Sequence, residues 1–375
     1  MSEEMRLGKG LDVGTAFCAC CYQTEEGKEK YRFQRDCFLD IEAGDEAKKM
    51  LVRSNANFIE SQDGSTIYVI GEDAITFANI LSGARGVSKD KKTLLRRPMS
   101  SGVLNPDEPE LAFQIMKEIL SNLLQEPREK GEVVAYSVPA KPVDADFNIM
   151  YHQKMIETII KGLGYEPKAT NEGLAVVYSE NPQIENDDEG VIPFSGVGCS
   201  WGGGMVNVCF AYKGFPLVEF SVADAYGMGE GSGGDWIDAQ VAKTRSDLST
   251  SKVTKFKEKH ADFTKDPMEL AVEISKNPRD LQKNTEILIA LDIYYRKLIE
   301  YVLLTLGEEF AKQGESVDDP IEIVVAGGTS SPDGFEILVM EEVENMNLPF
   351  EIKGVRKSAK PMHSVSNGCF VSAAT

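Results

Sequence analysis

The stretch that decides the fold is Ser195-Gly-Val-Gly-Cys-Ser-Trp-Gly-Gly-Gly-Met-Val-Asn-Val-Cys-Phe-Ala-Tyr-Lys-Gly214. Two apolar runs flank Gly202, Gly203 and Gly204, which predicts a strand, a glycine turn and a returning strand. Glycine lets the backbone approach a ligand closely and direct successive N–H groups at one anion. The local interpretation is a hairpin that cradles phosphate, and the alternative is a plain turn. The rest of the chain decides between these two interpretations, because a nucleotide site needs other binding segments besides this hairpin.

Composition bounds the class of protein. The chain has 375 residues and is 42% hydrophobic, enough for about two to three domains with cores of their own. Its 60 acidic and 40 basic side chains give a net charge of -20, which repels nucleic acids and anionic lipids. Because no apolar run reaches about 18 residues and the N-terminus lacks the apolar core of a signal peptide, we expect neither membrane insertion nor an export signal.

Cysteine usage indicates a reducing compartment. Seven cysteines are present, and Cys18, Cys20 and Cys21 are crowded together instead of spaced as in secreted disulfide frameworks. Successive residues of a strand face opposite ways, so this cluster cannot easily surround one metal ion. We interpret these cysteines as packing residues, with a zinc site as the alternative, and expect a cytoplasmic protein.

The first half of the chain opens with a hairpin over residues 7 to 23 that carries Asp12 at its tip. Further strands are predicted at Tyr31–Ile41, Ala56–Ile59 and Thr66–Ile70, a helix after Gly71, and an exposed loop at Ser82–Lys92. An amphipathic helix is predicted at Pro109–Leu124, because its apolar residues recur every four positions. The order strand, helix, strand then predicts parallel pairing through a right-handed crossover, followed by one more helix; the ranges are Glu132–Pro139, Phe147–Leu163, Tyr165–Thr170 and Glu172–Ser179.

The second half begins in the same way as the first. After the acidic segment Asn181–Gly190, which indicates a domain boundary, hairpins turned at glycine lead again to a parallel unit with the strand Ile321–Val325 and the helix Gly334–Glu344. A charged insertion over residues 249–284 precedes a long apolar helix at Leu288–Phe310. The similar halves predict a weak internal duplication.

Four separated segments together resemble the actin-like ATPase superfamily, which includes actins, chaperone ATPase domains and sugar kinases. Residues 12–15 resemble its first phosphate loop, residues 200–204 its second, and residues 324–329 its adenosine motif. The segment Arg97-Pro-Met-Ser-Ser-Gly-Val103 is similar to one of actins and of the rod-shape actins of bacteria. The overall pattern most resembles bacterial actin homologues such as the rod-shape, magnetosome and plasmid actins. The resemblance spans nearly the whole chain.

The resemblance implies an α/β fold of two duplicated ribonuclease H-like lobes with a nucleotide cleft between them. Lobe I is expected at residues 1–180, with a small insertion at about 31–97, and lobe II at residues 181–375, with an insertion at about 249–284. A C-terminal helix at about 361–375 is expected to pack back toward lobe I.

The resemblance also implies roles at the phosphate end of the site. Asp12 would hold Mg²⁺ through water, because hard cations prefer carboxylate and phosphate oxygens. Glu172, in a segment similar to the Glu-Pro helix start of bacterial actins, would orient the attacking water; alone, such a glutamate is ordinarily a first-turn charge at a helix N-terminus. The backbone N–H groups that would bind the phosphates belong to Gly14, Thr15, Gly202, Gly203 and Gly204.

The adenosine end draws on three other segments. Gly327, Gly328 and Thr329 would let adenosine lie against the backbone, although Thr329 and Ser330 could instead cap a helix. The loop that approaches the sugar resembles Gly233, Gly234 and Asp235, and the residues that would border base and ribose are Lys257 and Glu258. On composition alone, Lys257 belongs to a run of surface lysines.

One departure from the family concerns catalysis. The second phosphate loop normally begins with aspartate, and this chain has Ser200 there, while Gly173 replaces the proline after the glutamate. Loss of that carboxylate is expected to weaken metal binding or slow hydrolysis while the glycine turn still binds phosphate, unless Asn207 or Glu172 compensates.

The function implied by the resemblance is a cytoplasmic, cytoskeletal actin-like protein that binds ATP or ADP with Mg²⁺, hydrolyses ATP slowly and self-associates head-to-tail into filaments. A second hypothesis is a degenerate, non-polymerising relative that senses nucleotide as a scaffold, and a third is a small-molecule kinase, since this fold does not fix the phosphate acceptor. The sequence does not distinguish ATP from GTP.

Overall fold

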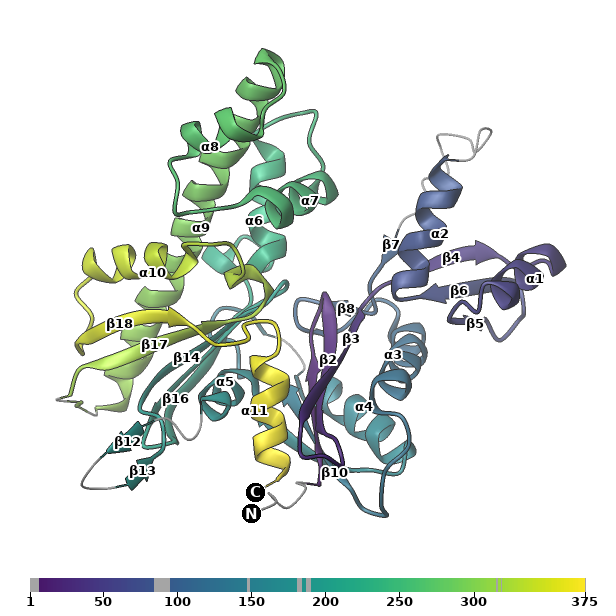
Figure 1. Ribbon diagram of the computed structural model, residues 1–375, viewed down its shortest axis with the longest axis horizontal. Helices are drawn as coiled ribbons and strands as arrows, with labels where there is room; N and C mark the ends of the chain where they lie inside the picture. Colours follow the sequence, from purple (N-terminus) through teal and green to yellow (C-terminus); the bar gives the residue numbers. More distant parts are fainter. Residues whose placement is uncertain are drawn as a thin grey trace.

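The computed structural model describes residues 7–83, 95–146, 149–180, 184–186, 190–314, 316–317 and 319–374. Two five-stranded sheets form its centre (Figure 1). The first has the order β11-β10-β1-β2-β3, with β1 at Lys9–Val13, β2 at Phe17–Gln23, β3 at Glu29–Arg35, β10 at Val133–Val138 and β11 at Glu166–Asn171. The second has the order β16-β15-β14-β17-β18, with β14 at Gly196–Trp201, β15 at Val206–Tyr212, β16 at Phe215–Val222, β17 at Ile321–Ala326 and β18 at Ile352–Lys357.

The two sheets have the same topology. In each, three consecutive antiparallel strands are extended by two parallel strands on the side of the first strand: β10 and β11 beside β1, and β17 and β18 beside β14. The predicted duplication and the parallel pairing of β10 with β11 are therefore correct. We call the parts built on the first and second sheets lobe I and lobe II.

Two helices lie between the lobes (Figure 1). These are α5, at Glu172–Ser179, and α11, at Ser364–Ala373. Small apolar side chains from both sheets pack with them in one shared core, which includes Ala135, Ala175, Cys209, Ala326 and Cys369. Because α5 and α11 touch both lobes, they form the joint on which the cleft depends.

Other helices cover the outer faces. Lobe I carries α3 at Pro109–Leu124 and α4 at Ile149–Gly162, and lobe II carries the 36-residue α9 at Pro278–Gln313 and α10 at Phe335–Glu344. The apolar side of α3 buries Ile115, Ile119 and Leu123 against the first sheet, as the four-residue spacing predicted.

Each lobe has an insertion. In lobe I a four-stranded sheet with two helices forms a small core of its own; it contains β4 (Phe38–Glu42), α1 (Asp45–Arg53), β5 (Phe58–Glu60), β6 (Thr66–Ile70), α2 (Glu72–Gly83) and β7 (Leu95–Arg96). In lobe II the insertion consists of α6 (Gly233–Lys243), α7 (Thr250–His260), α8 (Pro267–Ile274) and the beginning of α9. The short elements are β8 (Met99–Ser100), β9 (Val103–Leu104), β12 (Ile184–Asn186), β13 (Gly190–Ile192), and the single-turn helices η1 (Ala225–Gly227) and η2 (Gly328–Ser330).

In the segment Asn181–Gly190, where the sequence shows no pattern, β12 begins an antiparallel hairpin with β13. Two predicted boundaries are wrong. The single strand predicted at Tyr31–Ile41 is split at Asp36, because β3 belongs to the first sheet and β4 to the inserted one. The long helix starts at Pro278 instead of Leu288, since Asn277 accepts hydrogen bonds from the N–H groups of the first turn and caps it there.

Some expectations fall outside the described residues: most of the loop predicted at Ser82–Lys92, the predicted helix start at Phe147, and parts of the segment 181–190. All seven cysteines are buried thiols. Among the described helices, none combines the length and apolar character needed to cross a bilayer.

Candidate functional site

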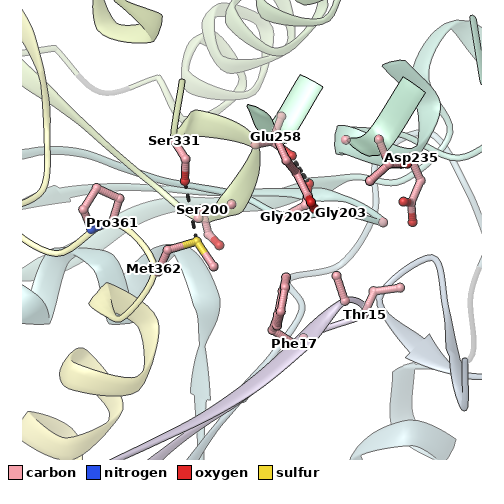
Figure 2. Close-up of a pocket in the computed structure, with 18 of the residues that line it drawn as sticks. Thr15, Phe17, Ser200, Gly202, Gly203, Asp235, Glu258, Ser331, Pro361 and Met362 are labelled. Atoms are coloured by element: carbon pink, nitrogen blue, oxygen red, sulfur yellow. Dashed lines mark hydrogen bonds between the residues drawn. The ribbon is translucent and has the colours of Figure 1, made fainter. Parts of the chain in front are cut away.

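A cavity of about 530 Å³ lies between the lobes and is lined by both (Figure 2). Of the residues predicted to form the site, Gly233 alone is not in its lining, and it lies directly behind the second glycine turn. Segments far apart in the sequence thus meet at one cavity. Its size is that of a small-molecule pocket.

The lobe I wall is the turn between β1 and β2. Asp12 is half-buried, and the hydroxyl of Ser137 donates to its Oδ1 at 3.3 Å. Burial raises the pKa of Asp12, and the Ser137 hydrogen bond opposes that shift. Next along the turn, Thr15 Oγ1 accepts a hydrogen bond of 3.0 Å from the N–H of Gly102, which fixes the turn against the β8–β9 hairpin.

The lobe II wall is the glycine turn between β14 and β15. Two of its carbonyl oxygens are already engaged: Gly202 O accepts from the N–H of Gly234 at 3.0 Å, and Gly203 O accepts from the N–H of Asp235 at 2.8 Å. In the described part of the chain, the N–H groups of Gly203 and Gly204 have no hydrogen-bond partner. These two N–H groups are free to bind an anion.

The two turns face each other closely. Thr15 and Gly203 lie on opposite sides of the cavity in Figure 2. A Cβ atom added at Gly204 would lie 2.8 Å from Thr15 Oγ1 in the other lobe. Only a residue without a side chain allows this approach.

Glu172 lies at the start of α5, between the turns. Its Oε2 accepts hydrogen bonds from Asn207 Nδ2 at 2.9 Å and from the Ser200 hydroxyl at 3.3 Å. Burial raises the pKa of Glu172, and the negative charge of Asp12 raises it further. Because the carboxylate is fixed at one oxygen inside the cavity, it can orient a water molecule or take its proton.

Asn207, which the sequence suggested only as a possible substitute for the missing carboxylate, contacts Glu172 directly. It is fully buried, and its Oδ1 accepts from the N–H of Ala140 in lobe I at 3.0 Å. It thus joins Glu172 to the segment after β10. The signal was present in the sequence as one amide side chain inside the apolar run Val206–Tyr212, since a buried amide needs partners.

At the end predicted for adenosine, Lys257 lines the cavity. This side chain is buried, and its Nζ pairs with Asp238 Oδ1 at 2.8 Å and donates to Gly234 O at 2.9 Å. It is therefore not one of the surface lysines, and it holds α7 against α6 beside the cavity. Glu258 is exposed at the rim.

The floor of this end is formed by η2 and by residues missed in the sequence. Gly327 has a φ of 92° and donates to Pro361 O at 2.8 Å, while Thr329 Oγ1 donates to Gly202 O at 2.7 Å. Pro361 and Met362 extend the apolar wall across from Gly202 (Figure 2). The flat, largely apolar ring of a nucleotide base is suited to such a wall.

Comparison with known proteins identifies the family and the fold. Residues 7–373 match the sequence model of the family described as Volactin. The chain belongs to the Volactin family. No curated protein matches it.

Two solved structures are similar to this Volactin-family chain over its whole length. A MamK double helical filament has a TM-score of 0.63 at 16% identity, covering 99% of each chain. A non-polymerising MamK mutant bound to AMPPNP has a TM-score of 0.53 at 15% identity, covering 100% of each chain. The chain therefore has the actin-like α/β fold that the sequence resemblance predicted.

The donor chemistry of this Volactin-family site fits Mg²⁺. In proteins, Mg²⁺ is held by one or two carboxylates, by water and by substrate phosphates. Asp12 is such a carboxylate, and Glu172 lies close enough to perturb it. Within the described residues no group of three or more protein ligands surrounds a metal position, so phosphate and water would have to complete the coordination.

Proposed function

We propose that this protein binds ATP or ADP with Mg²⁺ in the cavity between its lobes, hydrolyses ATP slowly and assembles head-to-tail into filaments. The observation that carries the proposal is the pair of facing turns, one with Asp12 and Thr15 and the other with Gly203 and Gly204, with Glu172 between them. The proposal is supported by the similarity of the chain to two solved structures, a MamK filament and a MamK mutant bound to AMPPNP. Seven buried thiols favour a cytoplasmic location.

In this mechanism the two turns hold the phosphates from opposite sides and Glu172 orients the attacking water. Bound Mg²⁺ would neutralise charge that develops on the phosphates. Asn207 and Ser200 keep the Glu172 carboxylate in place through Oε2. Closure of the lobes on nucleotide is a hinge motion at α5 and α11 that changes the surface offered to the next subunit.

Sedimentation and electron microscopy test the assembly. We expect filaments with ATP and Mg²⁺, and monomers when Mg²⁺ is chelated. Thermal-shift titrations with ATP and with GTP, each with and without Mg²⁺, test the nucleotide, because a bound ligand raises the unfolding temperature. Monomers at high protein concentration under all nucleotide conditions contradict filament formation, whatever the titrations show.

A non-polymerising nucleotide-sensing scaffold is the second candidate, and Ser200 is the observation that favours it. For Ser200→Asp we expect phosphate release about tenfold faster than for the slow wild type, because a carboxylate returns beside Glu172 and can hold hydrated Mg²⁺. Without Mg²⁺ the variant should lose about 1–3 kcal/mol of stability, since the new charge is buried beside the Glu172 carboxylate, which the Ser200 hydroxyl contacts at 3.3 Å in the wild type.

Ser195→Asp is the matched control. Ser195 lies just before β14, and its hydroxyl accepts from the N–H of Lys213, a bond that Asp can also accept. This variant should keep wild-type phosphate release. Fast phosphate release by the wild-type protein rules out the scaffold hypothesis, and a Ser200→Asp variant no faster than wild type removes Ser200 as the cause of slow hydrolysis.

A further inference from the structure

An ion pair crosses the cavity from one lobe to the other. Arg97 follows β7 in lobe I, and its Nη1 donates to Oδ2 of Asp235, in the first turn of α6 in lobe II, at 2.7 Å. Both side chains line the cavity and are half-exposed. This pair is therefore formed only when the lobes are close together.

Each residue of the ion pair is connected to one of the two turns that form the walls of the cavity, the β1–β2 turn in lobe I or the β14–β15 turn in lobe II. The N–H of Asp235 donates to Gly203 O at 2.8 Å, so the acidic partner is tied to the second turn. Arg97 precedes the β8–β9 hairpin, whose Gly102 donates to Thr15 in the first turn. Holding Arg97 on Asp235 consequently holds the two turns at their present separation.

A second carboxylate, that of Asp36, lies at the same end of a strand pair as Arg97. The strands β4 and β7 run antiparallel with Phe38 opposite Arg96, so the chain before Phe38 and the chain after Arg96 lie side by side. Asp36 has no exposed surface, and neither of its carboxylate oxygens has a hydrogen-bond partner in the described part of the chain. Burial raises its pKa well above the usual range, and the positive charge of Arg97 acts in the opposite direction. A buried carboxyl group without partners is costly, and a guanidinium satisfies it best.

Asp36 also lies against the first phosphate turn. Its N–H donates to Ala16 O at 3.0 Å. The neighbouring cation, Arg35, is engaged elsewhere, since its Nε pairs with Glu72 at 3.2 Å and its guanidinium lies over the Phe17 ring. Arg97 is thus the cation that can serve Asp36.

We propose that Arg97 is a positioning residue that exchanges between two carboxylates, Asp235 when the cleft is closed and Asp36 when it is open. The inference rests on the proposed nucleotide site. In the closed state the ion pair retards nucleotide release. In the open state Arg97 pairs with Asp36 after it has left Asp235. This second pair lowers the free-energy cost of opening.

The test is the dissociation rate of a fluorescent ATP analogue, chased with excess unlabelled ATP in the presence of Mg²⁺. Asp235→Asn should accelerate dissociation about three- to tenfold, the range expected for a half-exposed charge-assisted contact. Asp36→Asn should slow dissociation by a similar factor, because the open state loses the negative charge that pairs with Arg97. The two substitutions should therefore change the dissociation rate in opposite directions. This result distinguishes a switch of Arg97 between the two carboxylates from simple damage to the fold, which would accelerate release in both variants.

The exchange predicts that both effects depend on Arg97. In an Arg97→Met background neither carboxylate substitution should change the dissociation rate, and the reversed pair Arg97→Asp with Asp235→Arg should restore retention. The control is Lys265 with Glu273, an ion pair of similar exposure outside the cavity, whose replacement by Met and Gln should have no effect. An Asp36→Asn rate equal to or faster than wild type, or effects that persist without Arg97, overturns the proposal.

A readout without nucleotide separates this inference from the proposed function. Hydrogen exchange of peptides containing Gly102 and Gly204 reports opening of the free protein. Asp235→Asn should increase that exchange and Asp36→Asn decrease it. If the wild-type protein does not bind the analogue, the proposed nucleotide binding is wrong, and the role of Arg97 is not affected. If hydrogen exchange is unchanged in both variants, the proposed role of Arg97 is wrong.

Discussion

Replacing Glu172 by Gln is expected to lower the single-turnover rate of ATP hydrolysis about 10²- to 10⁴-fold, the usual contribution of a positioned acid–base group. The amide can still accept the hydrogen bond from Asn207, so the geometry of the site is kept. It cannot take a proton from water. The affinity for ATP should stay within a few fold of wild type, because the phosphates bind to the backbone of the turns.

Quench-flow measurement of the γ-phosphate released from bound ATP gives the rate, and equilibrium titration gives the affinity. Glu219→Gln is the control, since Glu219 is an exposed carboxylate of β16 outside the cavity lining. Its hydrolysis rate should equal that of wild type. If Glu172→Gln hydrolyses ATP as fast as wild type, another group acts on the water and the proposed role of Glu172 is wrong.

The sequence predicted much of the fold because several of its signals are local. The helices Pro109–Leu124 and Glu172–Ser179 have the predicted bounds. The first was predicted from its apolar spacing, and in the structure Asn171 caps the second. The two glycine turns were found for a similar reason, since few residues other than glycine permit such close approach. Local chemistry of this kind is readable without any knowledge of the tertiary structure.

The parts that were missed depend on contacts between distant segments. Asp36 was predicted to continue a strand, and only the separation of β3 from β4 shows that it is buried. Lys257 looks like a surface lysine until Asp238 is placed beside it. The Arg97–Asp235 pair joins residues 138 positions apart. No local pattern encodes such pairings, because they arise when the two lobes come together.

The joint between the lobes supports the second large prediction, that Gly368→Ala destabilises the protein by about 3 kcal/mol or more. A Cβ atom at Gly368 would lie 1.7 Å from the carbonyl oxygen of Ala175, so α11 would have to move away from α5. There is no room to move toward the first sheet, because Gly10 of β1 already lies against the backbone of α11. Overpacking between backbones cannot be relieved by a change of rotamer.

Gly307→Ala is the matched control, and its effect should have the opposite sign. Gly307 lies inside α9, where a Cβ atom would come no closer than 3.4 Å to Leu348, an ordinary contact. There alanine should stabilise by up to about 1 kcal/mol, because glycine in a helix loses more backbone entropy on folding. Urea unfolding of both variants measures the difference. A stable Gly368→Ala protein would mean that α11 can separate from α5 at little cost, and the hinge could not then depend on their close packing.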